Sequence, residues 1–229
     1  MQAIEQAIIL AAGRGTRLKW LTEKHPKPLM KIRDDYAIVH VIRALVAQGV
    51  KDIAINVHHH GQQIIDALGN GDHFGVRLHY SIEQQLLDSG GGVRTALAQL
   101  PHHHGDILVH NADILTHIDL RFMQKIAVDT DAVLAMVPNP PHHTKGDFTV
   151  VEDRVEHAGE PTFTFSGISI WQRAWVQQWP LQQNFSLVEK MREAMQKGRC
   201  GGFIHHGVWL DIGRPKDLMR ANQYRQTKR

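Results

Sequence analysis

Apolar and polar positions along the first 137 residues predict strands and helices in alternation. Short apolar runs rich in β-favouring residues predict buried strands, and apolar residues at helical spacing that end near glycine predict helices. The predicted strands are 7–12, 52–57, 76–80, 107–110 and 132–137, and the predicted helices are 35–48, 61–69 and 91–100. Alternating strands and helices are typical of crossover units, so we expect a mainly parallel sheet covered by helices.

The second half of the chain has a different pattern. It predicts a hairpin at 148–156, a long alternating strand at 162–171, a helix at 186–198, a strand at 203–210, a C-terminal helix from Pro215 and a frayed tail at 226–229. Ser186 and Glu189 have the spacing of a capping box, which marks the start of the fourth helix. No linker or repeat divides the halves. We therefore expect one domain, 1–229, with the second half as an antiparallel extension over one edge of the sheet.

Composition and charge exclude several classes of protein. The 229 residues include one cysteine, Cys200, which excludes a disulfide framework and a Cys-rich zinc module. The net charge is +3 and no Lys/Arg run exceeds two residues, so we expect no nucleic-acid partner but a small anionic ligand. Neighbouring histidines at 58–60 and 102–104 do not have the spacing of a zinc site. Without a signal peptide or an apolar run of ~18 residues, we expect no membrane contact and a cytoplasmic location.

A glycine-rich turn after the first predicted strand indicates phosphate binding. The segment 10–18 reads Leu-Ala-Ala-Gly-Arg-Gly-Thr-Arg-Leu, and Lys27 follows between two prolines. Successive amides in such a turn can form an anion nest, and the two arginines, Arg14 and Arg17, suit phosphate oxygens. A dinucleotide fingerprint needs a small residue where Leu18 stands, and a Walker A loop needs a lysine after Gly15.

Two aspartates follow predicted strands. Asp113 comes after the strand at 107–110, and Asp211 comes directly after the strand at 203–210. Ligands of open α/β sheets bind at the carboxyl ends of strands, and Mg²⁺ is usually held by one or two carboxylates together with substrate phosphates. Taken singly, an aspartate at the end of a strand is more often a helix cap or a turn residue than a metal ligand.

The glycine-rich segment, Leu21-Thr22 and Pro26-Lys-Pro-Leu29 together resemble the signature of sugar-1-phosphate nucleotidyltransferases. The resemblance runs from about residue 6 to residue 222. It implies a Rossmann-like three-layer α/β fold with a mixed, mainly parallel sheet of the nucleotidyltransferase A type and a small antiparallel extension.

The resemblance also implies roles for individual residues. The loop would wrap the triphosphate of a nucleotide, with Arg14, Arg17 and Lys27 as catalytic cations and Asp113 and Asp211 as ligands of Mg²⁺. The nucleotide-binding residues would be Leu10, Ala11, Ala12, Gly13, Gly15, Thr16, Glu83, Ser89 and Gly90. The residues facing the sugar phosphate would be Asn111, Gly146, Asp147 and Ser166, with His142 and His143 near the sugar by position.

The segments 61–64, 68–75, 139–148 and 162–168 are most similar to family members that transfer a uridylyl group from UTP to N-acetylmuramate 1-phosphate. This implies pyrophosphate release and a UDP-sugar for recycling of cell-wall precursors. A sugar 1-phosphate is largely dianionic at neutral pH, so it needs no general base. Two alternatives stay open: a guanylyltransferase acting on mannose 1-phosphate or another sugar 1-phosphate, and a sugar-nucleotide-binding module without activity. The sequence does not indicate an oligomeric state.

Overall fold

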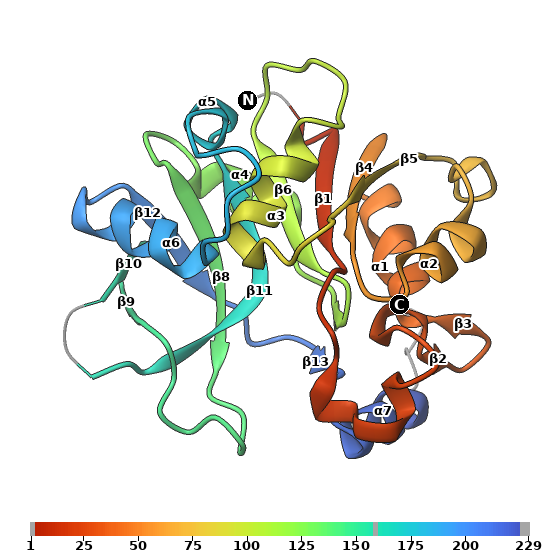
Figure 1. The fold of residues 1–229 in the computed structure, drawn as a ribbon. Helices are drawn as coiled ribbons and strands as arrows, with labels where there is room; N and C mark the ends of the chain where they lie inside the picture. Colours follow the sequence, from red (N-terminus) through yellow and green to blue (C-terminus); the bar gives the residue numbers. More distant parts are fainter. Residues whose placement is uncertain (1–2, 158–159, 225–229) are drawn as a thin grey trace.

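A computed structural model describes residues 3–157 and 160–224, apart from the side chains of Lys19 and Trp20. The predicted frayed tail at 226–229 lies outside the described residues. One large sheet has the strand order β5-β4-β1-β6-β11-β8-β12-β10-β9 (Figure 1). Its strands are β1 (Gln6–Leu10), β4 (Asp52–Val57), β5 (Arg77–Ile82), β6 (Ile107–Asn111), β8 (Ala132–Pro138), β9 (Thr149–Val151), β10 (Arg154–Glu156), β11 (Phe163–Trp171) and β12 (Cys200–Ile204).

The sheet is mixed and mostly parallel, as predicted. Strands β5, β4, β1 and β6 pair in parallel, and β8 pairs in parallel with β12. Strands β11 and β10 run against the others. The amino-terminal strand β1 ends at the lower edge of the sheet in Figure 1, and the glycine-rich segment follows it there. The carboxyl ends of the parallel strands therefore meet at this edge.

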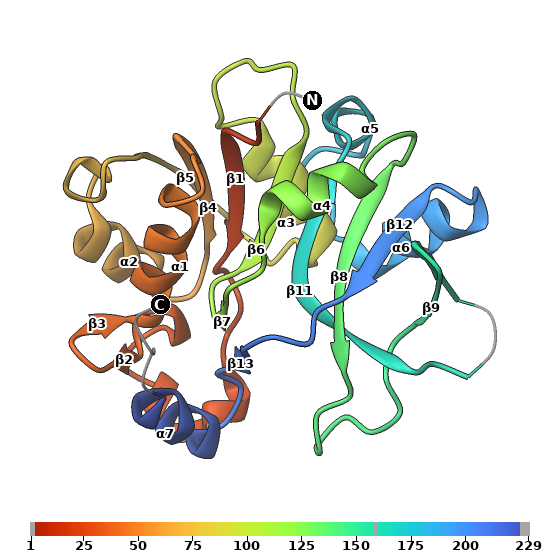
Figure 2. The same ribbon diagram turned by 180° about the vertical axis from the view of Figure 1, so that it is seen from behind.

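Helices cover both faces of the sheet and make three layers (Figures 1 and 2). Helices α3 (Asp88–Leu97), α5 (Arg173–Gln177) and α6 (Leu187–Gln196) pack on one face, and α1 (Ala37–Val46), α2 (Gly61–Leu68) and α4 (Leu120–Ile126) pack on the other. Helix α7 (Pro215–Gln223) lies below the carboxyl edge of the sheet. The remaining short elements are 3₁₀ turns at Thr16–Thr22, Lys27–Leu29 and Asp72–Phe74 and the strands β2 (Lys31–Ile32), β3 (Asp35–Tyr36), β7 (Ile114–Thr116) and β13 (Trp209–Asp211).

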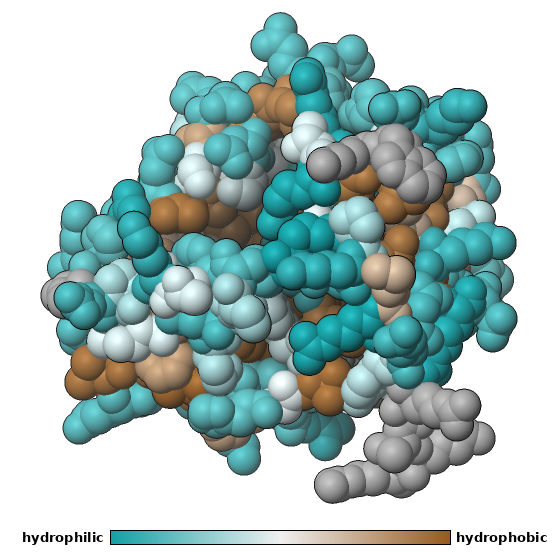
Figure 3. Space-filling view, turned by 90° about the horizontal axis from the view of Figure 1, so that it is seen from below, coloured by the Kyte–Doolittle hydropathy of each residue, from teal (hydrophilic) through white to brown (hydrophobic). Residues whose placement is uncertain are grey.

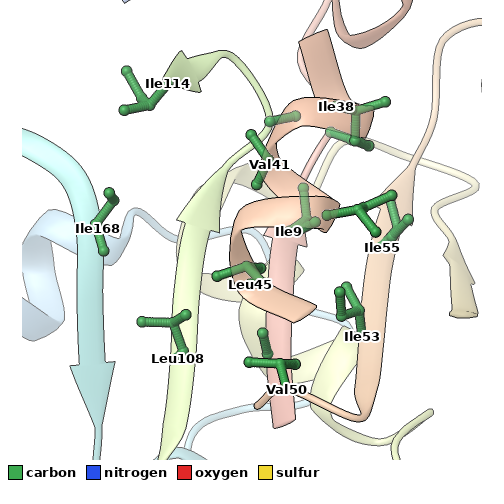
Figure 4. Packing of buried hydrophobic residues seen from close by; sticks show 14 of the residues in the cluster. Ile9, Ile38, Val41, Leu45, Val50, Ile53, Ile55, Leu108, Ile114 and Ile168 are labelled. Carbon is green, nitrogen blue, oxygen red and sulfur yellow. The ribbon is translucent and has the colours of Figure 1, made fainter. Parts of the chain in front are cut away.

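Successive side chains of the buried strands point to opposite faces of the sheet, so the hydrophobic core has two parts, one on each face. Ile8 packs under α3 and α6, whereas the next residue, Ile9, packs under α1. Figure 4 shows Ile9 of β1 and Ile55 of β4 beside Ile38 of α1. Burying one such side chain contributes roughly 1.5–3 kcal/mol. Packing on both faces therefore fixes the positions of these strands relative to one another, and with them the positions of their carboxyl ends.

Two expectations about the second half are wrong in detail. We expected the antiparallel part over one edge of the sheet; the β9–β10 hairpin does lie at an edge, but β11 is inserted between β6 and β8. A strand buried on both faces is compatible with any interior position, so its pattern does not identify its neighbours. The predicted strand at 203–210 is two strands: β12 pairs with β8, and β13 pairs with β7 in a separate sheet.

The chain leaves the large sheet between β12 and β13. There the hydroxyl of Thr116 donates to the carbonyl of Val208 at 2.7 Å, and Nε2 of His205 lies 3.3 Å from both of these oxygens. The break carries Asp211 across to β7. No helix in the described part of the chain has the length and apolar character that a membrane crossing requires.

Candidate active site

A cavity of about 530 Å³ opens beside the glycine-rich segment at the carboxyl edge of the sheet. Its walls include many of the residues that the sequence predicts for the nucleotide, the metal or the sugar phosphate. These are Leu10, Ala11, Ala12, Gly13, Gly15, Thr16, Arg17, Lys27, Glu83, Ser89, Asn111 and Asp113. The structure adds Pro28, Asn56, Leu86, Asp88, Ala112 and Asn184 to the same cavity, which we call the loop cavity.

The turn at Gly15 positions the loop. Gly15 has φ of +63°, a left-handed conformation that costs a non-glycine residue about 1–2 kcal/mol. A β-carbon at Gly15 would also lie 3.0 Å from Cβ of Lys27. The hydroxyl of Thr22 donates to the carbonyl of Gly15 at 3.1 Å, and the amide of Leu18 donates to the same oxygen at 2.9 Å. The absence of a side chain at Gly15 is therefore what allows Lys27 to lie against the loop.

Glu83 supports the loop rather than offering a free carboxylate. It is buried; its Oε1 accepts a hydrogen bond from Nδ2 of Asn56 at 2.7 Å, and its Oε2 accepts one from the amide of Leu87 at 3.0 Å. Asn56 in turn accepts from the amide of Ala11 at 2.8 Å. The chain Glu83–Asn56–Ala11 ties the wall of the cavity to the start of the loop. Sequence reasoning missed Asn56, although a polar residue inside the buried strand 52–57 was the available signal.

Ser89 and Gly90 differ in position. Ser89 lines the loop cavity, and its hydroxyl accepts a hydrogen bond from the amide of Leu187 at 2.9 Å. Gly90 is buried and does not line the cavity; a β-carbon there would lie 2.9 Å from the carbonyl oxygen of Phe185. Gly90 therefore serves the close packing of α3 against the segment before α6. Arg14 is exposed and lines neither this cavity nor the one described below.

Asp113 and Asp211 are brought together by the pairing of β7 with β13. Asp113 lies in the turn between β6 and β7, and Asp211, at the end of β13, is opposite Ile114. The amide of Ile212 donates to the carbonyl of Asp113 at 3.0 Å. Lys27 Nζ contacts Oδ2 of Asp113 as an ion pair, and Arg17 Nη1 lies 4.0 Å from Oδ2 of Asp211. Two carboxylates far apart in the sequence therefore share one place with two cations.

The electrostatics of this pair suit a divalent cation. Burial raises the pKa of Asp211, and the neighbouring Asp113 raises it further, whereas Lys27 and Arg17 lower it. A carboxylate is less stable in its charged form when it is removed from water, and also when a second carboxylate lies beside it. A hard divalent cation bound to oxygen would relieve both effects. The described residues contain no group of three or more His, Cys, Asp or Glu side chains placed to hold a metal, so this site could supply only part of a coordination shell.

A second cavity of about 310 Å³ lies on the other side of the aspartate pair. We call it the acceptor cavity. Arg17, Asn111 and Asp113 line both cavities, so the two spaces meet at these residues. Asp211 and Ser166 also line the acceptor cavity. Two ligands bound in the two spaces would therefore be adjacent at Asp113.

An irregularity in β11 forms the wall at Ser166. The register against β8 shifts between Phe165 and Ser169, and Gly167 there has φ of +86°. Ser166 is fully buried; its Oγ accepts from the amide of Ile168 at 3.2 Å, and its carbonyl accepts from Nε1 of Trp209 at 2.9 Å. The hydroxyl of Ser166 is therefore engaged within the wall.

Gly146 and Asp147 do not line the acceptor cavity. Asp147 Oδ2 accepts from the amide of Phe165 at 2.8 Å, and its Oδ1 lies 3.0 Å from Nε2 of His143. Asp147 thus fixes the loop that carries His142 and His143, both of which do line the cavity. Gly146 has φ of +73° and turns the chain into this loop.

Known proteins are similar to this chain over most of its length. A family model described as nucleotidyl transferase matches residues 6–228. N-acetylmuramate alpha-1-phosphate uridylyltransferase from Neisseria meningitidis serogroup B is 36% identical over 216 residues, which are 91% of this chain and 93% of that protein. D-glycero-alpha-D-manno-heptose 1-phosphate guanylyltransferase from Aneurinibacillus thermoaerophilus is 28% identical over 95% of this chain and 97% of its own. Mannose-1-phosphate guanyltransferase from Gibberella zeae is 27% identical, and the chain spans only 62% of its length.

Solved structures share the fold. HddC from Yersinia pseudotuberculosis matches with a TM-score of 0.80 and 23% identity over 96% of this chain and 98% of that one. A putative glucose-1-phosphate thymidylyltransferase from Bacillus anthracis matches with a TM-score of 0.82 and 18% identity over 95% of this chain and 93% of that one. At these identities the likeness concerns the fold alone.

Proposed function

The chain belongs to the nucleotidyl transferase family, and from that premise we propose that it transfers a uridylyl group from UTP to a sugar 1-phosphate, with N-acetylmuramate 1-phosphate as the preferred acceptor. Sugar-1-phosphate nucleotidyl transfer itself is supported by the family match and by its relatives. The uridylyl group and the N-acetylmuramate acceptor are inferred from the relative that is 36% identical.

One observation carries the proposal: the loop cavity and the acceptor cavity meet at Arg17, Asn111 and Asp113. A nucleoside triphosphate and a sugar 1-phosphate are both anions, and their reaction needs a place where two negative groups can approach. The glycine-rich loop and Lys27 line the loop cavity, Arg17 lines both cavities, and the carboxylates of Asp113 and Asp211 lie beside these cations.

In the proposed mechanism the chain binds and orients, and it neutralises charge. The amides of the glycine-rich loop and the cations of Arg17 and Lys27 would hold the β- and γ-phosphates of UTP. Asp113 and Asp211 would hold Mg²⁺, which when bound supplies positive charge to the phosphate oxygens. We propose these residues as the metal ligands because the pairing of β7 with β13 brings the two carboxylates together; the raised pKa of Asp211, caused by burial and by Asp113, agrees with this proposal.

The reaction requires no protein base. An oxygen of the acceptor phosphate forms a bond to the α-phosphorus of UTP, and the bond from that phosphorus to the bridging oxygen of the β-phosphate breaks. The electron pair leaves with pyrophosphate, and the products are pyrophosphate and a UDP-sugar. The second pKa of a phosphate monoester is ~6, so the nucleophile is already deprotonated at neutral pH. His110 is fully buried and its pKa falls to about 4, so it stays neutral under the site.

The test is a matrix of nucleoside triphosphates against sugar 1-phosphates, with pyrophosphate release as the measurement. UTP with N-acetylmuramate 1-phosphate is expected to give the highest kcat/KM. A maximum with GTP and mannose 1-phosphate or a heptose 1-phosphate would instead make the chain a guanylyltransferase, as two of its relatives are named. Binding of UTP with no pyrophosphate from any pair would indicate a sugar-nucleotide-binding module.

A further inference from the structure

A cavity of about 430 Å³ adjoins the acceptor cavity where α7 begins. Pro140, His142, Trp209 and Asp211 line both spaces, so the two are continuous. This further cavity extends away from the glycine-rich loop, toward α7. A sugar whose phosphate lies in the acceptor cavity beside Asp113 and Asp211 would therefore have a second space beside its ring.

The walls of this cavity carry an excess of positive charge. Arg214, Lys216 and Arg220 line it, against Asp211 and Asp217. Asp217 is already paired: its Oδ2 and Oδ1 accept from Nε and Nη2 of Arg214 at 2.8 and 3.1 Å. The side chains of Lys216 and Arg220 are exposed and make no hydrogen bond or ion pair with any residue that the structure describes. Two positively charged side chains therefore line the cavity without an ion-pair partner among the described residues.

His142 connects this charge to the acceptor cavity. Nη2 of Arg214 lies 2.7 Å from Nδ1 of His142, so the arginine donates and the neutral imidazole carries its proton on Nε2. Burial lowers the pKa of His142, and Arg214 lowers it further. His142 is thus an uncharged donor at the boundary between the two spaces, with cations behind it.

We propose that His142, Arg214, Lys216 and Arg220 form a pocket for an anionic substituent on the sugar ring of the acceptor, and that this pocket selects an acidic sugar 1-phosphate over its neutral counterpart. We call these four residues the cationic pocket. The proposal rests on the proposed function and names the feature of the acceptor that would be recognised. The substituent that fits is a carboxylate on a short arm, such as the ether-linked arm that distinguishes N-acetylmuramate from N-acetylglucosamine.

The chemistry of the pocket suits a carboxylate substituent. Guanidinium and ammonium groups bind carboxylates through charge-assisted hydrogen bonds, which are stronger than neutral ones. A site built with such donors rejects an analogue that lacks the acceptor, because the donors gain nothing from it. Figure 3 views the molecule from the side of α7 and shows hydrophilic side chains over most of this face, with apolar residues between them. The acidic arm would thus reach a polar, water-accessible pocket, and its binding should weaken with added salt.

The experiment compares two acceptors that differ only in the acidic arm: N-acetylmuramate 1-phosphate and N-acetylglucosamine 1-phosphate. The variant is K216Q/R220Q, which removes two exposed charges whose side chains make no hydrogen bond or ion pair within the described part of the chain. We expect the ratio of kcat/KM for the acidic acceptor to that for the neutral one to fall at least tenfold, and R220E to lower it as well.

The matched control is K125Q/R192Q, which removes one lysine and one arginine from exposed positions on α4 and α6. It changes the net charge equally and should keep the wild-type ratio. An unchanged ratio in K216Q/R220Q, an equal fall in the control, or a wild-type preference for the neutral acceptor would overturn the inference. These outcomes differ from failure of the proposed function, in which wild-type protein releases no pyrophosphate with UTP and either acceptor.

Discussion

The ion pair of Lys27 with Asp113 leads to a prediction about stability that can be separated from activity. The side chains of Lys27 and Asp113 are only 11% and 18% exposed, and Asp211 is close enough for Asp113 to raise its pKa. K27M leaves two largely buried carboxylates facing each other without the nearest cation. Breaking a buried pair from one side costs about 3–5 kcal/mol, and we take about 3 kcal/mol because Asp113 keeps some contact with water.

For a chain of this length about 1 kcal/mol corresponds to roughly 2–4 °C in Tm, so the metal-free variant should melt roughly 6–12 °C below wild type at pH 7. The difference should shrink toward pH 4, because protonation removes the unpaired charges, and it should shrink in Mg²⁺, because the metal replaces the lost cation. The assay is thermal unfolding in EDTA and in Mg²⁺ at several pH values. The control is K51M, which removes an exposed ion pair with Glu5 and should leave Tm essentially unchanged. Equal Tm values for K27M and wild type in EDTA, or a difference independent of pH, would refute the reasoning.

Three further predictions concern the same site. D211N should lower kcat/KM for pyrophosphate release more than tenfold, yet it should raise the Tm of the metal-free protein at pH 7. The pKa of Asp211 is raised in the folded state, so its charge lowers the folding stability at any pH above the ordinary pKa of a carboxyl. The gain in Tm should therefore vanish as the pH falls below that ordinary pKa, and a lower Tm at pH 7 would contradict the reasoning. G15A should lower kcat/KM at least tenfold, measured by pyrophosphate release, since its β-carbon would lie 3.0 Å from Cβ of Lys27, whereas G49A, with φ of +99° and open space around it, should lose stability and keep activity. E83Q leaves either Asn56 or Leu87 without a good acceptor, so it should cost about 1–3 kcal/mol in unfolding experiments and raise the KM for UTP; unchanged values of both would show that the bridge to Ala11 is not needed.

Much of the fold could be predicted from the periodicity of apolar residues, and the predictions that were wrong have a common cause. The strands and helices predicted for the first 137 residues appear close to their predicted bounds because each carries a pattern that its own burial requires, whereas the short elements β2, β3, β7 and α4 were not predicted. Helix α3 begins at Asp88, before the predicted 91–100, and Asp88 has φ of +57°, which the pattern of apolar residues does not report. The position of β11 and the division of 203–210 depend on partners far along the chain, and local patterns carry no information about them.

At the site, too, the sequence indicates which types of residue are present but not which groups surround each of them. Many of the residues that line the loop cavity, including Asp113 and Lys27, are among those that the family resemblance implies for the site, because residue type and motif spacing can be recognised in a sequence. It does not show that both oxygens of Glu83 are occupied, or that the carboxylate of Asp147 holds the amide of Phe165. Those interactions depend on which groups the fold places within hydrogen-bond distance, and only the assembled structure provides that.

The central claim is that the cationic loop and the aspartate pair together allow two anionic substrates to react. The most direct measurement is pyrophosphate release from UTP and N-acetylmuramate 1-phosphate across a titration of Mg²⁺, for wild type, K27A and D113A. The account predicts no turnover without a divalent cation and a kcat/KM at least tenfold lower in each variant, or ~1.4 kcal/mol of transition-state stabilisation. Wild-type rates without a divalent cation, or full turnover in either variant, would contradict it.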